Sequence, residues 1–321
     1  MSDFQHIPVL LPQVLAALQP QGGGLFLDGT LGGAGHARAL LEASGSQGRL
    51  IGIDQDEEAI AASGRVLADF GERAEIFQDN FSNLIGVLER SALAGHRSEG
   101  VLAGILLDLG ISSHQVDAGA ARGFAYNQDG PLDMRMDLNS RLDAAYIVNN
   151  YSREELADLL YRYSEERWAK RIAQFIIKAR QDGPILTTGH LVAIIKAAIP
   201  AGAREKDQHP AKRSFQSLRI AVNDELGALE KGLAAAVTAL QPGGRLCVIS
   251  FHSLEDRIVK KFYQLESATC ICPPQSPVCT CGKVARLKII NRKPLVASEA
   301  EIAANPRARS AKARIAEKIN A

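Results

Sequence analysis

Residues 24–37 read GLFLDGTLGGAGHA, and this stretch decides the fold. Its first part, Gly24–Asp28, is an apolar run that ends in an acid and predicts a buried strand. Four glycines follow before a helical pattern over His36–Ala43. Glycines let a backbone approach a ligand closely, and the first turn of a helix offers free N–H donors. The stretch therefore predicts a strand, a ligand-binding loop and a helix, as in an α/β protein.

The same alternation of strand and helix patterns recurs along the chain. A helical pattern over Glu57–Phe70 separates two further apolar runs. Strands that alternate with helices predict parallel βαβ units, and strands that are apolar throughout predict a sheet covered on both faces. The further expected strands are Arg49–Asp54, Ala74–Gln78, Val101–Asp108 and, after the Pro-Gly-Gly turn at 242–244, Arg245–Ser250.

Helical patterns replace strand patterns in the middle of the chain, after a polar stretch that ends near Ser140. Ser164, followed by two glutamates, predicts the N-cap of an amphipathic helix that contains Trp168. Further helices are expected over Thr187–Ala198 and Ser214–Leu240.

The fifth strand decides how these parts are connected. A lone strand at 245–250 needs a sheet to join, which argues against two consecutive domains. We therefore interpret the chain as one α/β domain, residues 1–112 and 214–321, interrupted by a mainly helical insertion over residues 113–213.

The composition is that of an ordinary globular protein, with 46% hydrophobic and 23% charged residues in a chain of 321. No apolar run approaches the ~18–20 residues that span a bilayer. The N-terminus lacks the basic and then apolar pattern of a secretory signal. We expect a cytoplasmic protein without membrane contacts, and both a monomer and a homodimer stay open.

Charge is distributed unevenly along the chain. Residues 1–60 carry seven acidic and two basic side chains, whereas residues 283–321 carry ten basic and three acidic ones. This asymmetry is typical of a surface for an anionic partner, and equally of a solvated basic tail.

Acidic residues follow the strands where a nucleoside cofactor would need them. Asp54 ends the second strand and is placed to accept hydrogen bonds from ribose hydroxyls. The glycine spacing fits NAD(P) poorly, because it does not form G-x-G-x-x-G. S-adenosylmethionine (SAM) fits better, since Asp28 can meet its ammonium group and Phe81 its adenine. The alternative is a tight turn, with Asp54 as a helix cap and Phe81 in the core.

Several longer motifs resemble one family, the RsmH (MraW) methyltransferases of bacteria. They cover most of the chain and keep the order of the family. The matching stretches are HIPVL from His6, DGTLGGAGHA at 28–37, LLDLGISSHQVD at 106–117, RGFAYNQDGPLDMRMD at 122–137, YSEERWAKRIA at 163–173, HPAKRSFQSLRIAVNDEL at 209–226, PGGRLCVISFHSLEDRIVK at 242–260 and NPRARSAKAR at 305–314.

The resemblance implies a Rossmann-like, class I methyltransferase domain with an inserted helical domain. It implies SAM-dependent methylation of N4 of a cytosine in the decoding (P-site) region of 16S rRNA, within the small ribosomal subunit. With Gly33 of the loop, the implied SAM contacts are Ala34, Gly35, His36, Asp54, Phe81, Asp108 and Gln115. Ala34 departs from the glycine of the family, and we expect its extra methyl to be tolerated only at negative φ.

Methyl transfer to an exocyclic amine needs positioning and electrostatics, because the nitrogen lone pair is delocalised into the ring. Asp108, Ser112 and Ser113 follow the fourth strand and are candidates to hydrogen-bond the amine. After the fifth strand, Phe251 is a candidate to stack on a flipped base and His252 to orient it or relay a proton. A structural hydrogen bond is the alternative for His252.

RNA recognition requires cationic side chains that contact phosphates. A solvated helix face is the alternative for those on helices, and Arg135 alternates with Asp133 and Asp137, with which it can pair instead. The candidates are Arg135, Arg167, Lys170, Arg171, Lys212, Arg213, Arg307 and Arg309, with Lys312 and Arg314 beyond them.

Two cysteine pairs, Cys270-Ile-Cys272 and Cys279-Thr-Cys281, stand apart from these motifs. Four thiols can hold one tetrahedral zinc, although zinc fingers usually space them as C-x2–4-C. Free thiols in a variable loop are the favoured interpretation, so we expect no metal.

Three rival functions stay open for the whole chain. They are a SAM-dependent methyltransferase of another RNA or protein substrate, a non-catalytic rRNA-binding assembly factor, and an NAD(P) dehydrogenase.

Overall fold

The computed structural model describes residues 8–111, 122–205, 208–273, 275–276 and 278–320. The chain forms two compact units, one with the residues up to Gly110 and from Gly227 onwards, the other with Ile111–Leu226. The sequence interpretation began the return to the first unit at residue 214. The difference is helix α11 (Lys212–Asn223), because its apolar residues pack in the core of the helical unit.

The first unit is built on a mixed sheet with the strand order β3-β2-β1-β4-β5-β8-β6, and β7 pairs with β8. Strands β1 to β5 are parallel, and β8 is antiparallel to β5. This is a Rossmann-like, class I fold, which confirms the predicted fold class. The strands are β1 (Gly24–Asp28), β2 (Gly48–Asp54), β3 (Ala74–Gln78), β4 (Leu102–Asp108), β5 (Leu240–Ser250), β6 (Leu287–Ile289), β7 (Leu295–Val296) and β8 (Lys312–Lys318).

The predicted Pro-Gly-Gly turn lies inside β5 rather than before it. Pairing of β5 with β4 jumps from Leu240 opposite Leu102 to Arg245 opposite Gly104. Gly243 takes φ 79° within this irregularity, a conformation that glycine adopts without strain. The turn therefore bulges the strand without ending it.

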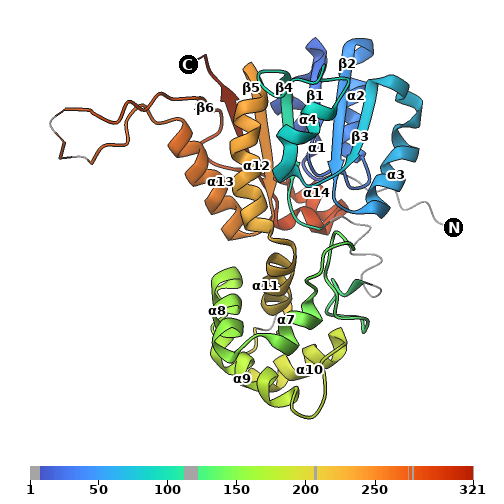
Figure 1. The fold of residues 1–321 in the computed structure, drawn as a ribbon, viewed down its shortest axis with the longest axis vertical. Coiled ribbons are helices and arrows are strands. Elements are labelled where there is room, and N and C mark those ends of the chain that lie inside the picture. Colours follow the sequence, from blue (N-terminus) through green and yellow to red (C-terminus); the bar gives the residue numbers. More distant parts are fainter. Residues whose placement is uncertain (1–7, 112–121, 206–207, 274, 277, 321) are drawn as a thin grey trace. The chain divides into compact units, whose positions relative to one another are not determined.

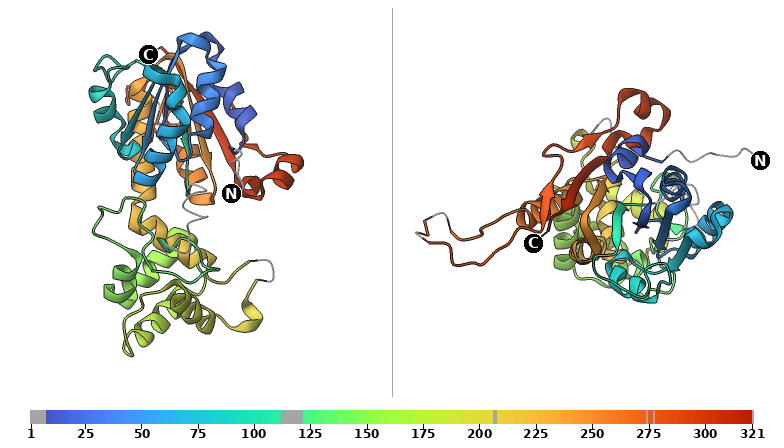
Figure 2. Two further views of the ribbon diagram at one scale, coloured as in Figure 1. Left: turned by 90° about the vertical axis from the view of Figure 1, so that its right-hand side faces the viewer. Right: turned by 90° about the horizontal axis from the view of Figure 1, so that it is seen from above.

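Helices cover both faces of this sheet (Figures 1 and 2). One apolar core includes side chains of α4, α12 and α13, and a second includes those of α1, α2 and α3. The central strands are buried on both faces, as their apolar sequences predicted. The helices of this unit are α1 (Leu11–Leu18), α2 (Gly35–Ala43), α3 (Glu57–Leu67), α4 (Leu84–Arg90), α12 (Glu225–Ala239), α13 (Ser253–Glu266) and α14 (Glu299–Ala304).

The second unit is helical and has its own core. Ile147, Leu160, Ile172 and Ile195 are each at most 2% exposed within it. Four helices contribute these side chains, α7 (Ala144–Asn150), α8 (Arg153–Ser164), α9 (Ala169–Ala179) and α10 (Thr188–Ala198). Helix α8 packs against α11 and α9, α7 packs against α11, and α10 packs against α9.

The predicted N-cap at Ser164 is wrong. Ser164 is the last residue of α8, where its hydroxyl donates to the Leu160 carbonyl, and Glu165 ends the helix with φ 52°. The next helix begins at Ala169 with Trp168 as its N-cap and no side-chain capping bond, and the Glu166 carboxylate accepts from the Trp168 N–H at 2.9 Å just before it. Polar residues between two helices can satisfy the last carbonyls of one helix or the first N–H groups of the next, and the sequence alone does not show which.

The single helix predicted over Ser214–Leu240 is also wrong, because Asp224 takes φ 46° and separates α11 from α12. Asn223 is the last residue of α11. Its side chain accepts from the Met136 N–H and donates to the Met134 carbonyl, both at 2.8 Å. Aspartate tolerates the left-handed conformation better than most residues, so the break costs little.

Candidate active site

The parallel strands β1, β2 and β4 each end in an aspartate at the same edge of the sheet. Asp28 pairs in register with Gly52 of β2 and Leu106 of β4, in the centre of that edge. The structure thus brings together three of the predicted site residues, Asp28, Asp54 and Asp108.

Hydrogen bonds to these aspartates fix the glycine-rich loop. Oδ2 of Asp54 accepts from the Gly32 N–H at 2.8 Å, and Oδ1 of Asp28 accepts from the Thr30 N–H at 3.1 Å. Oγ1 of Thr30 accepts in turn from the backbone N–H of Asp108 at 2.6 Å. The loop is therefore preorganised on the strand ends.

Two glycines of the loop have different reasons to be glycine. A Cβ on Gly35 would lie 2.6 Å from Cγ of Pro8, so packing excludes a side chain there. A Cβ on Gly33 would meet no described atom within 4 Å, and its φ lies outside the left-handed region. Gly33 is exposed and opens the start of α2 to an approaching group.

The expectation of a negative φ at Ala34 is wrong. Ala34 has φ 59° and ψ 20°, and it is fully buried. The chain must turn here so that the Ala34 N–H can donate to the Leu31 carbonyl at 2.7 Å. A non-glycine residue in this conformation stores about 1–2 kcal/mol of strain.

The aspartates share an environment that disfavours their charged forms. Burial raises the pKa of Asp28 to about 7, and the nearby charge of Asp54 adds to this. Burial also raises the pKa of Asp108 well above its usual value, as do the charges of Asp28 and Glu255. For Asp54, burial raises the pKa against opposing backbone hydrogen bonds. A cationic ligand would relieve this cost.

One carboxylate oxygen at this edge lacks a partner. Oδ1 of Asp108 is buried and has no hydrogen-bond partner among the described residues. Its Oδ2 lies 3.6 Å from Nδ1 of His36. Nε2 of His36 lies 2.9 Å from the Val9 carbonyl, which can only accept, so this nitrogen carries a proton. A buried acceptor without a partner is costly unless a ligand satisfies it.

These features fit SAM, which carries a positively charged sulfonium and an ammonium group. Desolvated carboxylates favour cations, the helix N-terminus offers N–H donors, and the open face at Gly33 permits close approach. Asp28 and Asp108 are the residues suited to the cationic part of the cofactor.

Phe81 lies next to this edge but packs within the domain. It begins a 3-10 turn after β3, and a Cβ on Gly232 of α12 would lie 2.5 Å from its Cδ2 atom. Its ring is half-buried, so both a core role and a ligand contact are compatible with its position.

Two neighbours of Phe81 were not among the predicted site residues. Gln55 accepts from the Asn80 amide at 2.9 Å, and Asp79 donates its backbone N–H to the Asp54 carbonyl at 3.0 Å. Asp79 also pairs with Arg90. Their position directly after β2 and β3 is the signal that could have found them.

The end of β5 gives His252 a capping role. Its Nδ1 accepts from the Glu255 N–H at 3.4 Å, and its Nε2 lies 3.1 Å from Oε1 of the same glutamate. Oε2 of Glu255 accepts from the Phe251 N–H at 2.8 Å. This capping box at the start of α13 supports the structural alternative for His252 and positions Phe251.

Three predicted site residues, Ser112, Ser113 and Gln115, lie outside the described residues.

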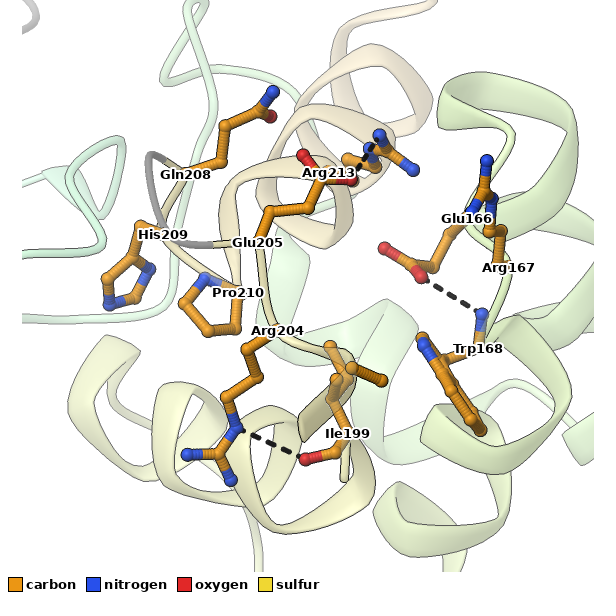
Figure 3. Close-up of a pocket in the computed structure, with 11 residues that line it drawn as sticks. Glu166, Arg167, Trp168, Ile199, Arg204, Glu205, Gln208, His209, Pro210 and Arg213 are labelled. Atoms are coloured by element: carbon orange, nitrogen blue, oxygen red, sulfur yellow. Dashed lines mark hydrogen bonds and ion pairs between the residues drawn. The ribbon is translucent and has the colours of Figure 1, made fainter. Parts of the chain in front are cut away.

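The helical unit contains a pocket of about 350 Å³, within the range of small-molecule sites (Figure 3). Trp168 and the predicted RNA contacts Arg167 and Arg213 line it. Arg213 pairs with Glu205 at 3.0 Å, whereas exposed Arg167 makes no hydrogen bond or ion pair within the described part of the chain. The pocket thus combines an indole ring with an available guanidinium group.

The other predicted cations of this unit differ in availability. Lys170, Arg171 and Lys212 are exposed. The prediction that Arg135 contacts RNA is corrected. Its guanidinium donates to both carboxylate oxygens of Asp133 at 2.7–2.8 Å and to two backbone carbonyls. Its donors hold the loop before α7, so we do not retain it as an RNA contact.

The C-terminal cations also divide into two groups. Arg307 and Arg309 are exposed in the 3-10 turn before β8. The prediction that Arg314 contacts RNA is corrected as well. Arg314 is buried and makes a bidentate ion pair with Asp256, with N–O distances of 2.7 and 3.1 Å. It ties β8 to α13 and leaves no free guanidinium for a phosphate.

Among the residues that the structure describes, no helix has both the length and the apolar character needed to cross a membrane.

Comparison with known proteins agrees with the geometry of the sheet edge. Residues 3–319 match the MraW methylase family. A ribosomal RNA small subunit methyltransferase H from Heliobacterium modesticaldum is 57% identical over 98% of this chain and 99% of its own. The enzyme of the same name from Heliobacterium mobile is 55% identical over 99% of this chain and all of its own. The chain belongs to the MraW methylase family.

Proposed function

We propose that this protein transfers the methyl group of SAM to ribosomal RNA of the small subunit. Its family and the names of its relatives support this activity. The observation that supports the cofactor is the buried Asp108 oxygen, which has no hydrogen-bond partner in the described part of the chain and lies beside a second desolvated carboxyl and a glycine-rich loop.

Each residue of this edge would have its own role toward SAM. Asp28 would bind the ammonium group, and Asp54 would accept from the ribose hydroxyls. Phe81 would contact the adenine. Asp54 also holds Gly32, so it would link cofactor binding to loop shape. The remaining proposed contacts are Gly33, Ala34, Gly35, His36, Asp108 and Gln115.

The finer proposal is methylation of N4 of a cytosine in the decoding region of 16S rRNA. The N4 lone pair forms the new bond to carbon, the carbon–sulfur bond breaks with its electron pair left on sulfur, and N4 releases a proton. Asp108 would accept that proton in its ionised form, which the positive charge of the bound cofactor would favour over the effect of burial. Ser112 and Ser113 are proposed to help orient the amine, and Phe251 to stack on the base.

RNA would contact the exposed cations of both units and the half-buried Arg213, which would exchange Glu205 for a phosphate. These side chains would neutralise phosphates, and the pocket at Trp168 would offer stacking for a nucleotide. The proposed contacts are Arg167, Lys170, Arg171, Lys212, Arg213, Arg307 and Arg309.

The decisive experiment supplies methyl-labelled SAM and small ribosomal subunits from cells that lack this activity. Labelled nucleosides are then identified by mass spectrometry. We expect N4-methylcytidine or a derivative of it. A label in protein or at another nucleoside would refute the proposed target, and RNA binding without any label would favour a non-catalytic assembly factor.

Calorimetry with two variants separates SAM binding from catalysis. Asp54→Ala should weaken SAM binding by ~1–3 kcal/mol, because it removes hydrogen bonds to a charged group. The exposed Asp69, in the same unit, provides Asp69→Ala as a control with unchanged affinity. Equal affinity of Asp54→Ala and the wild type would exclude Asp54 from the site.

A further inference from the structure

The chain between α13 and β6 extends away from the helices that cover the sheet, as the views in Figures 1 and 2 both show. Its ends are tied together, because the buried Glu266 pairs with Arg286 at 2.6 Å and with Lys283 at 3.4 Å. Beyond this base, Ile271 and Val278 are 55% and 70% exposed. Apolar burial therefore does not explain how the excursion holds its shape.

Its four cysteines converge at one point. The Sγ–Sγ distances are 3.5 Å for Cys270–Cys279, 3.6 Å for Cys279–Cys281, 3.9 Å for Cys281–Cys270 and 4.0 Å for Cys272–Cys279. All four sulfur atoms lie within 4.8 Å of one another. A tetrahedron of sulfurs at 2.3 Å from a central zinc has edges of about 3.8 Å, so the observed spacing fits a single ion.

The backbone around the sulfurs has the features of a metal-binding loop. The Cys272 N–H points at Sγ of Cys270, and the Ile271 N–H at Sγ of Cys281, both at 3.4 Å. Such contacts stabilise thiolates, the form that binds metal. Gly282 takes φ 58° directly after Cys281, so the chain turns sharply behind the last sulfur. A Cβ on Gly282 would meet no described atom within 4 Å.

We propose that Cys270, Cys272, Cys279 and Cys281 bind one structural zinc ion that shapes the excursion between α13 and β6. Four protein ligands close the coordination sphere, which is the arrangement of structural rather than catalytic zinc. Binding displaces the thiol protons to solvent and requires no redox step. The site is separate from the aspartates of the sheet edge and does not depend on the proposed methyl transfer.

The test measures metal in the full-length protein, purified without a histidine tag under reducing conditions. We expect about one zinc per chain, lost in the double variant Cys270→Ser/Cys279→Ser. Cys247→Ala is the matched control, because it removes the buried fifth thiol in β5 and should retain the zinc. Less than about 0.2 zinc per chain after incubation with zinc, or one iron in its place, would overturn the assignment.

Two further measurements on the wild-type protein keep the test valid if the double variant does not fold. Replacement of zinc by Co²⁺ should produce the thiolate charge-transfer absorption and the visible bands of tetrahedral cobalt, and their absence would count against the site. Thiols titrated in the denatured, unreduced protein should number five. A value of about one would indicate two disulfides and refute zinc binding.

Discussion

The buried Asp28 makes the stability of the first unit depend on pH. Asp28 is 1% exposed, and burial raises its pKa from 3.8 to about 7. The fold therefore keeps the proton of Asp28 up to about pH 7, whereas the unfolded chain releases it near pH 4. Stability present at low pH is lost as the pH rises between these values. One pKa unit corresponds to about 1.4 kcal/mol, so the full loss is ~4 kcal/mol, of which ~2–3 kcal/mol falls between pH 5 and pH 8.

Asp28→Asn removes this titration and keeps the acceptor for the Thr30 N–H. We expect the variant to gain stability relative to the wild type by ~2–3 kcal/mol between pH 5 and pH 8, in the absence of SAM. The same variant should bind SAM more weakly, because an amide does not attract the ammonium group. Added SAM should stabilise the wild type more at pH 8 than at pH 5.

The assay must follow the unit that contains Asp28. The only tryptophan, Trp168, lies in the helical unit, so its fluorescence reports on the other part of the chain. Hydrogen exchange of peptides from β1 and β4, measured over a urea series at each pH, reports on the right unit. Asp69→Asn, at an exposed position of the same unit, should change stability by less than ~0.5 kcal/mol at every pH. A difference between Asp28→Asn and the wild type that is constant from pH 5 to pH 8 would refute the reasoning.

Three further variants test the loop, Phe81 and the helical unit. Gly33→Ala should leave the free energy of unfolding within ~0.5 kcal/mol of the wild type but weaken SAM binding about tenfold, as measured by calorimetry. An unchanged affinity would mean that the bound ligand does not contact this residue. Gly232→Ala places a methyl against the Phe81 ring and should lower stability by ~1–3 kcal/mol in urea unfolding, whereas a neutral result would show that the ring moves freely. Asn223→Ala removes two hydrogen bonds to the loop before α7 and should cost the helical unit ~1–3 kcal/mol, followed by Trp168 fluorescence; a change below ~0.5 kcal/mol would show that water replaces the amide.

Electrostatic binding of RNA predicts a measurable dependence on salt. The triple variant Arg167→Ala/Lys170→Ala/Arg171→Ala should reduce the slope of log affinity against log salt by about two to three, because each lost phosphate contact contributes nearly one. Arg135→Ala is the comparison, since its guanidinium is held by Asp133. An equal slope for the triple variant and the wild type would remove these three residues from the RNA surface.

Local sequence predicted the first four parallel strands closely, because each is an apolar run that ends at a polar residue, whereas β5 begins five residues before the predicted Arg245. The predicted and observed bounds of β1 and β3 coincide, and those of β2 and β4 differ by one residue. The end of α11 escaped prediction for a physical reason. The apolar face from Phe215 to Leu233 continues through Asp224, and one left-handed residue leaves no trace in that periodicity. The bonds of Asn223 that accompany the break come from a loop far away in the sequence.

For the candidate site too, sequence predicted some features and not others. That Asp28, Asp54 and Asp108 share an edge follows from parallel strands alone, and sequence sufficed to predict it. Their electrostatics did not follow, because the pKa of Asp108 is raised first by its burial in the fold and then by the charges of Asp28 and of Glu255, which lies far along the chain. Likewise, whether an arginine is available depends on its partners. Arg135 pairs with Asp133, a neighbour in sequence that already offered this partner, whereas Arg314 pairs with Asp256, which only the fold brings to it.

Ala34 shows how a correct premise led to a wrong expectation. A side chain at positive φ is strained, so a negative φ was expected where alanine replaces the glycine of the family. The loop nevertheless keeps φ 59°, because the bonds of Gly32 to Asp54 and of Ala34 to Leu31 fix its path. The strain of about 1–2 kcal/mol is largely offset. Burial of one methyl contributes about 0.8 kcal/mol, and alanine loses about 0.4–1 kcal/mol less conformational entropy than glycine on folding. Alanine is thus tolerated without any change of loop conformation, and the N–H groups at the start of α2 keep the orientation that a ligand would need.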